Sequence, residues 1–319
     1  MRWSALALAL WGVPSRAAEA ELQSLLLSRQ CGALETLVRE SLTRDPLDEA
    51  APWYWGRQAA NDPRGRAELM PRARACVRDR PQSARCQHLL GVLIGAELTD
   101  DGGLAAMRGI GKVRERFECA VELAPHDYAM RRDLLGFQLD VPALMGGSAR
   151  KAREQAQALE RIDAPRGVLL QTLMAISDKA FDMAEQRLAG VQPGADLQLA
   201  SDLRAVQIDF GLAMLDSETA GRARAWFERL AQRDPSDPDV QVGRGRALPV
   251  LKQPDAAASA FERALQLNPR LRIAHRLGAA YEAAGQSAKA IDAYRRALTG
   301  PADRAAADKT RDWLKALQR

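Results

Sequence analysis

Residues 211–235, GLAMLDSETAGRARAWFERLAQRDP, are echoed by residues 245–269, GRALPVLKQPDAAASAFERALQLNP. In both stretches a glycine is followed after 12 residues by alanine, after 16 by phenylalanine and after 24 by proline, and equivalent residues lie 34 apart. A third copy, GAAYEAAGQSAKAIDAYRRALTGP over 278–301, follows at an interval of 33, with its proline one residue early. Self-similarity at this period predicts a stack of helical hairpins.

The apolar residues inside one copy predict two antiparallel helices. Leu277, Gly278 and Tyr281 fall on one face of a first helix, and Ala290 and Tyr294 on one face of a second. Glycine and alanine let the two backbones approach, and the closing proline ends the second helix. One hairpin cannot bury its own apolar face, so several must stack. The sequence therefore predicts an all-α protein, a right-handed α-solenoid.

The spacing of Gly211, Ala223, Phe227 and Pro235 resembles that of the tetratricopeptide repeat. The resemblance implies a scaffold without catalytic activity or cofactor, which binds a protein or peptide in its concave groove. A narrower resemblance rests on residues 85–165, where Pro142 is followed by Gly146-Gly147. This stretch is similar to a group of exported bacterial tetratricopeptide proteins that carry a Pro-x-x-x-Gly-Gly loop. That resemblance implies a lineage and no particular activity.

The same skeleton persists upstream with looser spacing and predicts roughly eight helical pairs. Residues 21–165 form the irregular part, with insertions over 95–112 and 140–148, and residues 166–319 form the more regular part. Because no Ser/Gly-rich linker divides them, one continuous solenoid is expected. Ala302–Arg319 predicts a final helix with Trp313 and Leu314 on one face, which would cap the exposed end of the core.

Residues 1–20 predict a signal peptide. Arg2 precedes an apolar run over 5–13, Pro14 breaks the run, and Ala18-Glu19-Ala20 forms an A-x-A cleavage site. The alternative is an N-terminal anchor or an ordinary first helix, but the run is too short to span a bilayer. We therefore expect cleavage after Ala20, a periplasmic or secreted protein, and no stable membrane insertion.

The composition argues against several classes of function. The net charge is +5 on 319 residues, which is weak evidence for nucleic-acid binding. Only three histidines occur, and none lies near a nucleophile in a known catalytic motif. Cys86-Gln87-His88 offers ligand types, but no second pair follows at zinc spacing. The sequence predicts no enzyme, no metal site and no cofactor.

The cysteines Cys76 and Cys86 lie five residues either side of Pro81, a predicted turn between two helices. Equidistant positions on an antiparallel hairpin face each other, which brings the Cα atoms close to the roughly 5.5–6 Å that a disulfide needs. An oxidising compartment permits the bond. The sequence favours a Cys76–Cys86 disulfide over two buried thiols, and leaves Cys31 and Cys119 unpaired.

In tetratricopeptide repeats the groove is lined by fixed positions of the first helix of each pair. Carrying these positions onto this chain suggests aromatic, aliphatic and basic residues suited to an extended peptide or an amphipathic helix. Trp53 and its neighbour Trp55 could equally belong to the core. The predicted partner-binding residues are Trp53, Arg57, His88, Phe137, Leu212, Arg246, Arg272 and His275.

An alternative function uses the loop Gly146-Gly147-Ser148 with Arg150. Glycines, free backbone N–H groups and nearby cations at a helix N-terminus could bind an anion. The protein would then be a periplasmic small-anion or glycan-binding protein that uses the irregular middle repeats. The competing interpretation is a solvated turn whose cations point away from the helix axis.

Pro249 falls four residues after Gly245 in a predicted first helix. Proline inside a helix clashes with the carbonyl four residues earlier and removes a hydrogen bond, so we expect a kink or an early end there. Such a kink would widen the groove between Leu212 and His275. The alternative is simple tolerance near the end of a helix that closes by Lys252.

Overall fold

A computed structural model describes residues 16–299, apart from 29, 47, 61 and 102, together with residues 310–315. Residues 16–299 form sixteen α-helices and one 3₁₀ helix, and no strand occurs in the described ranges. The all-α prediction is confirmed. Most of the predicted signal peptide, residues 1–15, lies outside the described residues.

The α-helices follow one another as eight successive pairs, the number predicted from the sequence. In chain order they are α1 Arg16–Leu27, α2 Cys31–Arg44, α3 Ala50–Ala59, α4 Pro63–Asp79, α5 Ala84–Asp101, α6 Gly103–Leu123, α7 Tyr128–Asp140, the 3₁₀ helix η1 Ala143–Met145, α8 Ala149–Glu160, α9 Ala164–Ser177, α10 Phe181–Gly190, α11 Leu197–Ala213, α12 Ala220–Arg233, α13 Pro238–Val250, α14 Pro254–Leu267, α15 Ala274–Ala283 and α16 Ser287–Thr299.

The repeated glycines permit the close approach of the two helices in a pair. A Cβ atom on Gly211 would lie 2.5 Å from the ring of Phe227, and one on Gly278 would lie 2.5 Å from the ring of Tyr294. Gly245 has the same relation to Phe261, at 2.6 Å. Since real Cβ atoms do not approach other atoms so closely, these positions need glycine. The packing role predicted for the repeat residues is confirmed.

Four of the pairs begin with an aspartate that caps the first helix. Asp127, Asp163, Asp196 and Asp237 each accept a hydrogen bond from a backbone N–H in the first turn of α7, α9, α11 and α13. Such a cap typically stabilises a helix by about 1 kcal/mol. The caps fix where each pair starts, and they keep the successive pairs in register.

The insertion over 95–112, expected between two helices, lengthens both of them instead. Helix α5 continues to Asp101 and α6 begins at Gly103, so the extra residues build a longer hairpin. A Cβ atom on Gly109 would lie 2.5 Å from Leu98, which shows how closely α6 packs on α5 there. The insertion therefore packs on itself and forms no loop over the groove.

The early end of α13 that Pro249 could cause is not found. Helix α13 ends at Val250, five residues after Gly245, and α15 ends at Ala283, five residues after the equivalent Gly278. Pro249 thus occupies the last turn of α13, where it removes one backbone hydrogen bond but is followed by only one more helical residue. The alternative of tolerance near the helix end explains this position.

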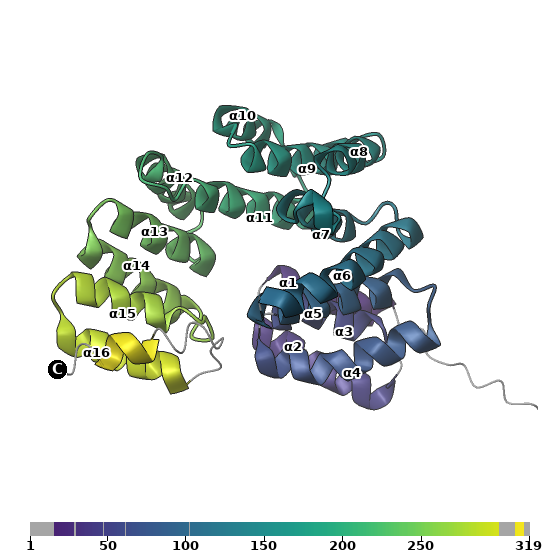
Figure 1. The fold of residues 1–319 in the computed structure, drawn as a ribbon, viewed down its shortest axis with the longest axis horizontal. Coiled ribbons are helices and arrows are strands. Elements are labelled where there is room, and N and C mark those ends of the chain that lie inside the picture. The colour runs from purple at the N-terminus through teal and green to yellow at the C-terminus, as the bar shows by residue number, and fades with distance from the viewer. Residues whose placement is uncertain are drawn as a thin grey trace, which may run out of the picture.

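The stack bends into an arch, with the first pairs at one end and the last pairs at the other (Figure 1). Side chains also connect distant pairs. The Gln23 Nε2 atom on α1 donates a hydrogen bond of 3.2 Å to Gln198 Oε1 on α11. Arg270, in the turn after α14, forms an ion pair of 3.2 Å with Glu35 on α2. The first helical pair therefore meets the C-terminal half of the chain.

The C-terminal end of the core is covered as the sequence predicts. Residues 310–315 are helical, and the remaining predicted cap residues, 302–309 and 316–319, lie outside the described part. The ring of Trp313 stacks on Tyr294 at a centroid distance of 5.5 Å, and Leu314 packs on the same apolar cluster. Among the described helices, none is both long and apolar enough to cross a membrane.

Candidate partner-binding face

A chain of hydrogen bonds joins the first helices of three successive pairs. Trp53 Nε1 on α3 donates to His88 Nδ1 on α5 over 3.0 Å, and His88 Nε2 lies 2.9 Å from Asp133 Oδ2 on α7. Because Nδ1 accepts from the indole, the neutral imidazole carries its proton on Nε2 and donates it to Asp133. Both ring nitrogens of His88 are therefore occupied, and the side chain is only 1% exposed.

Arg57 extends from α3 beside this chain of hydrogen bonds. Its guanidinium lies 5.3 Å from the centroid of the Trp53 ring, a cation–π geometry. The side chain is exposed and forms no ion pair with any residue that the structure describes. Burial alone would raise the pKa of Asp133, but the hydrogen bond from His88 and the charges of Arg132 and Arg57 lower it on balance. Asp133 is therefore a carboxylate at neutral pH.

A second group of predicted residues lies in the C-terminal pairs. Arg246 on α13 is partly buried and forms no hydrogen bond or ion pair through its side chain with the described residues. Burial and the nearby charge of Arg276 on α15 both lower the pKa of Arg246. The positive charge of Arg276 therefore acts on Arg246, and no carboxylate among the described residues pairs with Arg246. A negatively charged group from outside would relieve both effects.

Apolar residues accompany these arginines on neighbouring helices. Leu212 on α11 is partly exposed, and Val250 at the end of α13 is 39% exposed. Arg272, just before α15, and His275, in its first turn, are also partly exposed. This part of the surface therefore offers both apolar contacts and positive charge.

The structure divides the eight predicted partner-binding residues into accessible and buried ones. Arg57, Leu212, Arg246, Arg272 and His275 are exposed or partly exposed. By contrast, Trp53 is 6% exposed, His88 1% and Phe137 7%. These three pack in the core, so a partner cannot reach them in this conformation. Trp55, at 5% exposed, also belongs to the core.

The backbone N–H groups of the Gly146–Ser148 loop donate hydrogen bonds to carbonyl groups earlier in the chain. Gly146 donates to Ala143, Gly147 to Pro142, and Ser148 to the Gln138 carbonyl over 2.7 Å. Ser148 caps α8 as the sequence suggests, by accepting from the Lys151 N–H. Arg150 pairs with Glu154 on its own helix at 2.5 Å. The loop amides are therefore already occupied, and the proposed anion site gains no support from them.

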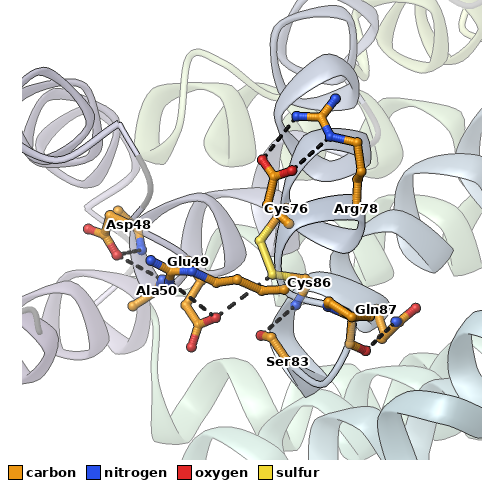
Figure 2. Close-up of a disulfide and its surroundings, with 12 residues drawn as sticks. Asp48, Glu49, Ala50, Cys76, Arg78, Ser83, Cys86 and Gln87 are labelled. Carbon is orange, nitrogen blue, oxygen red and sulfur yellow. Dashed lines mark hydrogen bonds and ion pairs between the residues drawn. A yellow bond between two sulfur atoms is a disulfide. The ribbon is translucent and has the colours of Figure 1, made fainter.

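The disulfide predicted between Cys76 and Cys86 is present, with a Cα–Cα distance of 5.5 Å. It links the end of α4 to the first turn of α5 (Figure 2). Glu49, from the segment before α3, points toward the bond, and its Oε2 lies 3.8 Å from the Cys86 sulfur. Cys119 is a free thiol, and burial raises its pKa.

Sequence reasoning missed Arg276, Asp133 and Glu49. Each acquires its environment from a helix 30 or more residues away in the chain: Arg246 for Arg276, His88 for Asp133 and Cys86 for Glu49. The repeat pattern places such residues on helices, but it does not specify which side chains meet between pairs. No signal in a single sequence marks these contacts.

Comparison with known proteins finds one tetratricopeptide repeat in this chain and a similar fold among solved structures. The family model for the tetratricopeptide repeat matches residues 271–299, which contain α15 and α16. The structure resembles yeast Tom70, with a TM-score of 0.58 and 11% identity over 90% of this chain and 59% of that one. It also resembles a tetratricopeptide repeat protein from Parabacteroides merdae, with a TM-score of 0.45 and 12% identity over 80% of this chain and 93% of that one.

At these identities the likeness to solved structures shows the fold alone. The chain spans 59% of the length of the yeast Tom70 chain. No curated protein has significant sequence similarity to this chain.

Proposed function

We propose that this protein is a scaffold without catalytic activity, which binds a protein partner by an extended acidic peptide on the concave face of its C-terminal pairs. The single observation that carries the proposal is Arg246, a partly buried guanidinium that has no anionic partner among the described residues. Partial burial of an unpaired charge costs free energy, and a paired carboxylate reduces that cost. A carboxylate of the partner would supply that pair for Arg246 and for Arg276.

The apolar residues on the neighbouring helices indicate that the peptide also carries apolar side chains. Leu212 and Val250 lie on the helices that flank or contain Arg246, and both are partly exposed. An extended peptide that alternates apolar and acidic side chains would contact both kinds of residue. This proposal uses the accessible part of the predicted set and leaves Trp53, His88 and Phe137 in the core.

We also propose that the protein works outside the cytoplasm, in a periplasm or in the surrounding medium. The A-x-A sequence at 18–20 and the apolar run before it support this location. The Cys76–Cys86 disulfide supports it too, because such bonds persist mainly in oxidising compartments. Mass spectrometry of the mature N-terminus tests it: a chain that retains residues 1–20 contradicts export by a cleaved signal peptide.

A peptide-binding measurement with charge-reversed variants tests the binding face. One peptide with fixed apolar residues would be prepared in three versions, in which the alternate residues are acidic, amide or basic. Each version would be titrated into the purified protein. The acidic version should bind most tightly, and the double variant Arg246→Glu/Arg276→Glu should weaken that binding by at least about tenfold.

The matched control is Arg263→Glu/Arg295→Glu, which makes the same charge change at two exposed arginines on α14 and α16. This control should bind the acidic peptide within about twofold of the original protein, since salt screens distant surface charges. Equal losses in both variants would indicate a general charge effect and would overturn the proposed site. Tighter binding of the basic peptide would overturn it as well.

A further inference from the structure

The disulfide and Glu49 bring together three groups that are metal ligands when the bond is reduced. One ligand atom each from Glu49, Cys76 and Cys86 lies within 4.8 Å of the other two. They come from three separate segments: the end of α4, the first turn of α5 and the residue before α3. Figure 2 shows the carboxylate of Glu49 directed toward the sulfur atoms.

From this cluster we propose that reduction of the disulfide creates a binding site for a thiophilic divalent cation of the zinc type, held by Cys76, Cys86 and Glu49. Cysteine thiolates and glutamate carboxylates both bind zinc, and a zinc site with three protein ligands keeps a water molecule in the fourth position. This inference does not depend on the proposed function. Its three residues lie before α3, in α4 and in α5, whereas the proposed peptide contacts α11, α13 and α15.

The separation of the ligand atoms suits such an ion. Tetrahedral ligands at about 2.3 Å (sulfur) and about 2.1 Å (oxygen) from zinc lie roughly 3.6 Å apart. The Cys86 sulfur and Glu49 Oε2 are already 3.8 Å apart. Once the S–S bond opens, the Cys76 sulfur has to move away from the Cys86 sulfur to reach the third position.

The charges around the site favour a cation in the reduced state. Two thiolates and Glu49 would place three negative charges together, opposed by Arg80, which lies 3.6 Å from Glu49. Like charges at this distance repel, and a bound divalent ion removes the repulsion. Binding to the dithiol releases two protons, one from each thiol.

The reduction step is chemically balanced with a dithiol as the reductant. Cys86 is 1% exposed, whereas Cys76 is partly exposed, so the incoming thiolate attacks the Cys76 sulfur. The S–S bond breaks and Cys86 leaves as a thiolate in the first turn of α5, where the helix N-terminus stabilises negative charge. The second thiol of the reductant then attacks the mixed disulfide, which releases Cys76 and the oxidised reductant.

Cobalt(II) is a suitable probe because its bonds to thiolate absorb in the near ultraviolet. The experiment uses the full chain in a Cys31→Ser/Cys119→Ser background, so that only Cys76 and Cys86 carry sulfur ligands. After anaerobic reduction the protein should bind one cobalt ion and show thiolate absorption, and zinc should displace the cobalt. The oxidised protein should show neither signal.

Two variants separate a three-ligand site from simple binding to a dithiol. Glu49→Gln should weaken cobalt binding by at least about tenfold, and Arg80→Ala should leave it equal or tighter. The matched control Glu115→Gln, at an exposed glutamate of α6, should not change the affinity. Unchanged binding in Glu49→Gln, or absorption of equal strength in the oxidised protein, would overturn the proposal.

A second measurement covers the case in which reduction loosens the hairpin. If the reduced site forms as proposed, zinc raises the melting temperature of the reduced protein, because a ligand that binds only the folded state stabilises it. The site would be ruled out if the reduced protein does not bind one cobalt ion per chain and zinc does not raise its melting temperature.

Discussion

At the scale of single residues, the same amino acid has different roles within one helical pair, α7 and α8. Gly147 has no room for a side chain, since a Cβ atom there would lie 1.6 Å from the backbone oxygen of Val141. Gly146 beside it has φ of 105°, a conformation that glycine adopts easily. By contrast, a Cβ atom on Gly136 in α7 would meet nothing within 4 Å. The Pro-x-x-x-Gly-Gly loop therefore needs its glycines for backbone geometry.

This difference predicts opposite effects of two alanine substitutions. Gly147→Ala should lower the free energy of unfolding by about 2–4 kcal/mol, because the clash is with backbone and no rotamer change relieves it. Gly136→Ala should raise it by about 0.5–1 kcal/mol, because alanine favours the helix. Urea titration followed by circular dichroism measures both. A change of the same sign and size in the two variants would contradict this view of the loop.

Single residues could be predicted from the sequence where their partners are close in the chain. Cys76 and Cys86 were paired correctly because one turn at Pro81 separates them. The environment of Trp53 could not be predicted, because the groove pattern and the core pattern overlap at that position. Its burial depends on His88, which belongs to the next helical pair.

At the scale of elements, the effect of a proline on stability depends on its position in the helix. Pro71 is the ninth residue of α4, in its middle, whereas Pro249 is the last but one residue of α13. Both side chains are exposed, so neither contributes to a core. Because α13 ends one residue after Pro249, no later turn of the helix follows that a kink there could redirect.

These positions predict unequal effects of replacing each proline by alanine. Pro71→Ala should raise the free energy of unfolding by about 2 kcal/mol. Proline in a helix interior destabilises the fold by about 3 kcal/mol. By restricting the unfolded chain it also stabilises the fold by about 1 kcal/mol, and the substitution loses that contribution. Pro249→Ala should change it by less than about 1 kcal/mol, because one hydrogen bond is regained and the same stiffness is lost. Thermal unfolding of both variants checks this. A larger increase in the free energy of unfolding for Pro249→Ala would indicate that Pro249 strains α13.

At the scale of the whole molecule, the contact between the first pair and the C-terminal half could not be predicted. It depends on the small rotation between successive pairs, which accumulates along the solenoid. The repeat period determines that pairs stack, but the irregular pairs before Pro165 leave each rotation undetermined. Two polar contacts, Gln23 with Gln198 and Arg270 with Glu35, connect the distant pairs.

These contacts predict how the arch responds to salt. Arg270 is 63% exposed, so its ion pair with Glu35 contributes at most about 1 kcal/mol. The double variant Gln198→Ala/Arg270→Glu removes the hydrogen bond and places two negative charges opposite each other. Small-angle X-ray scattering at low salt should then give a larger radius of gyration, with an unchanged helix content.

The sign of the salt effect distinguishes this contact from general loosening. Salt at about 1 M shortens the screening length to about 3 Å, which weakens attraction in the original protein and repulsion in the variant. The original protein should therefore expand and the variant contract, so that their radii converge. The matched control Gln266→Ala/Arg263→Glu removes a 3.5 Å contact within α14 and should behave like the original protein. Equal radii at low salt would show that the arch stays closed without these side chains, through the stacking of its helices alone.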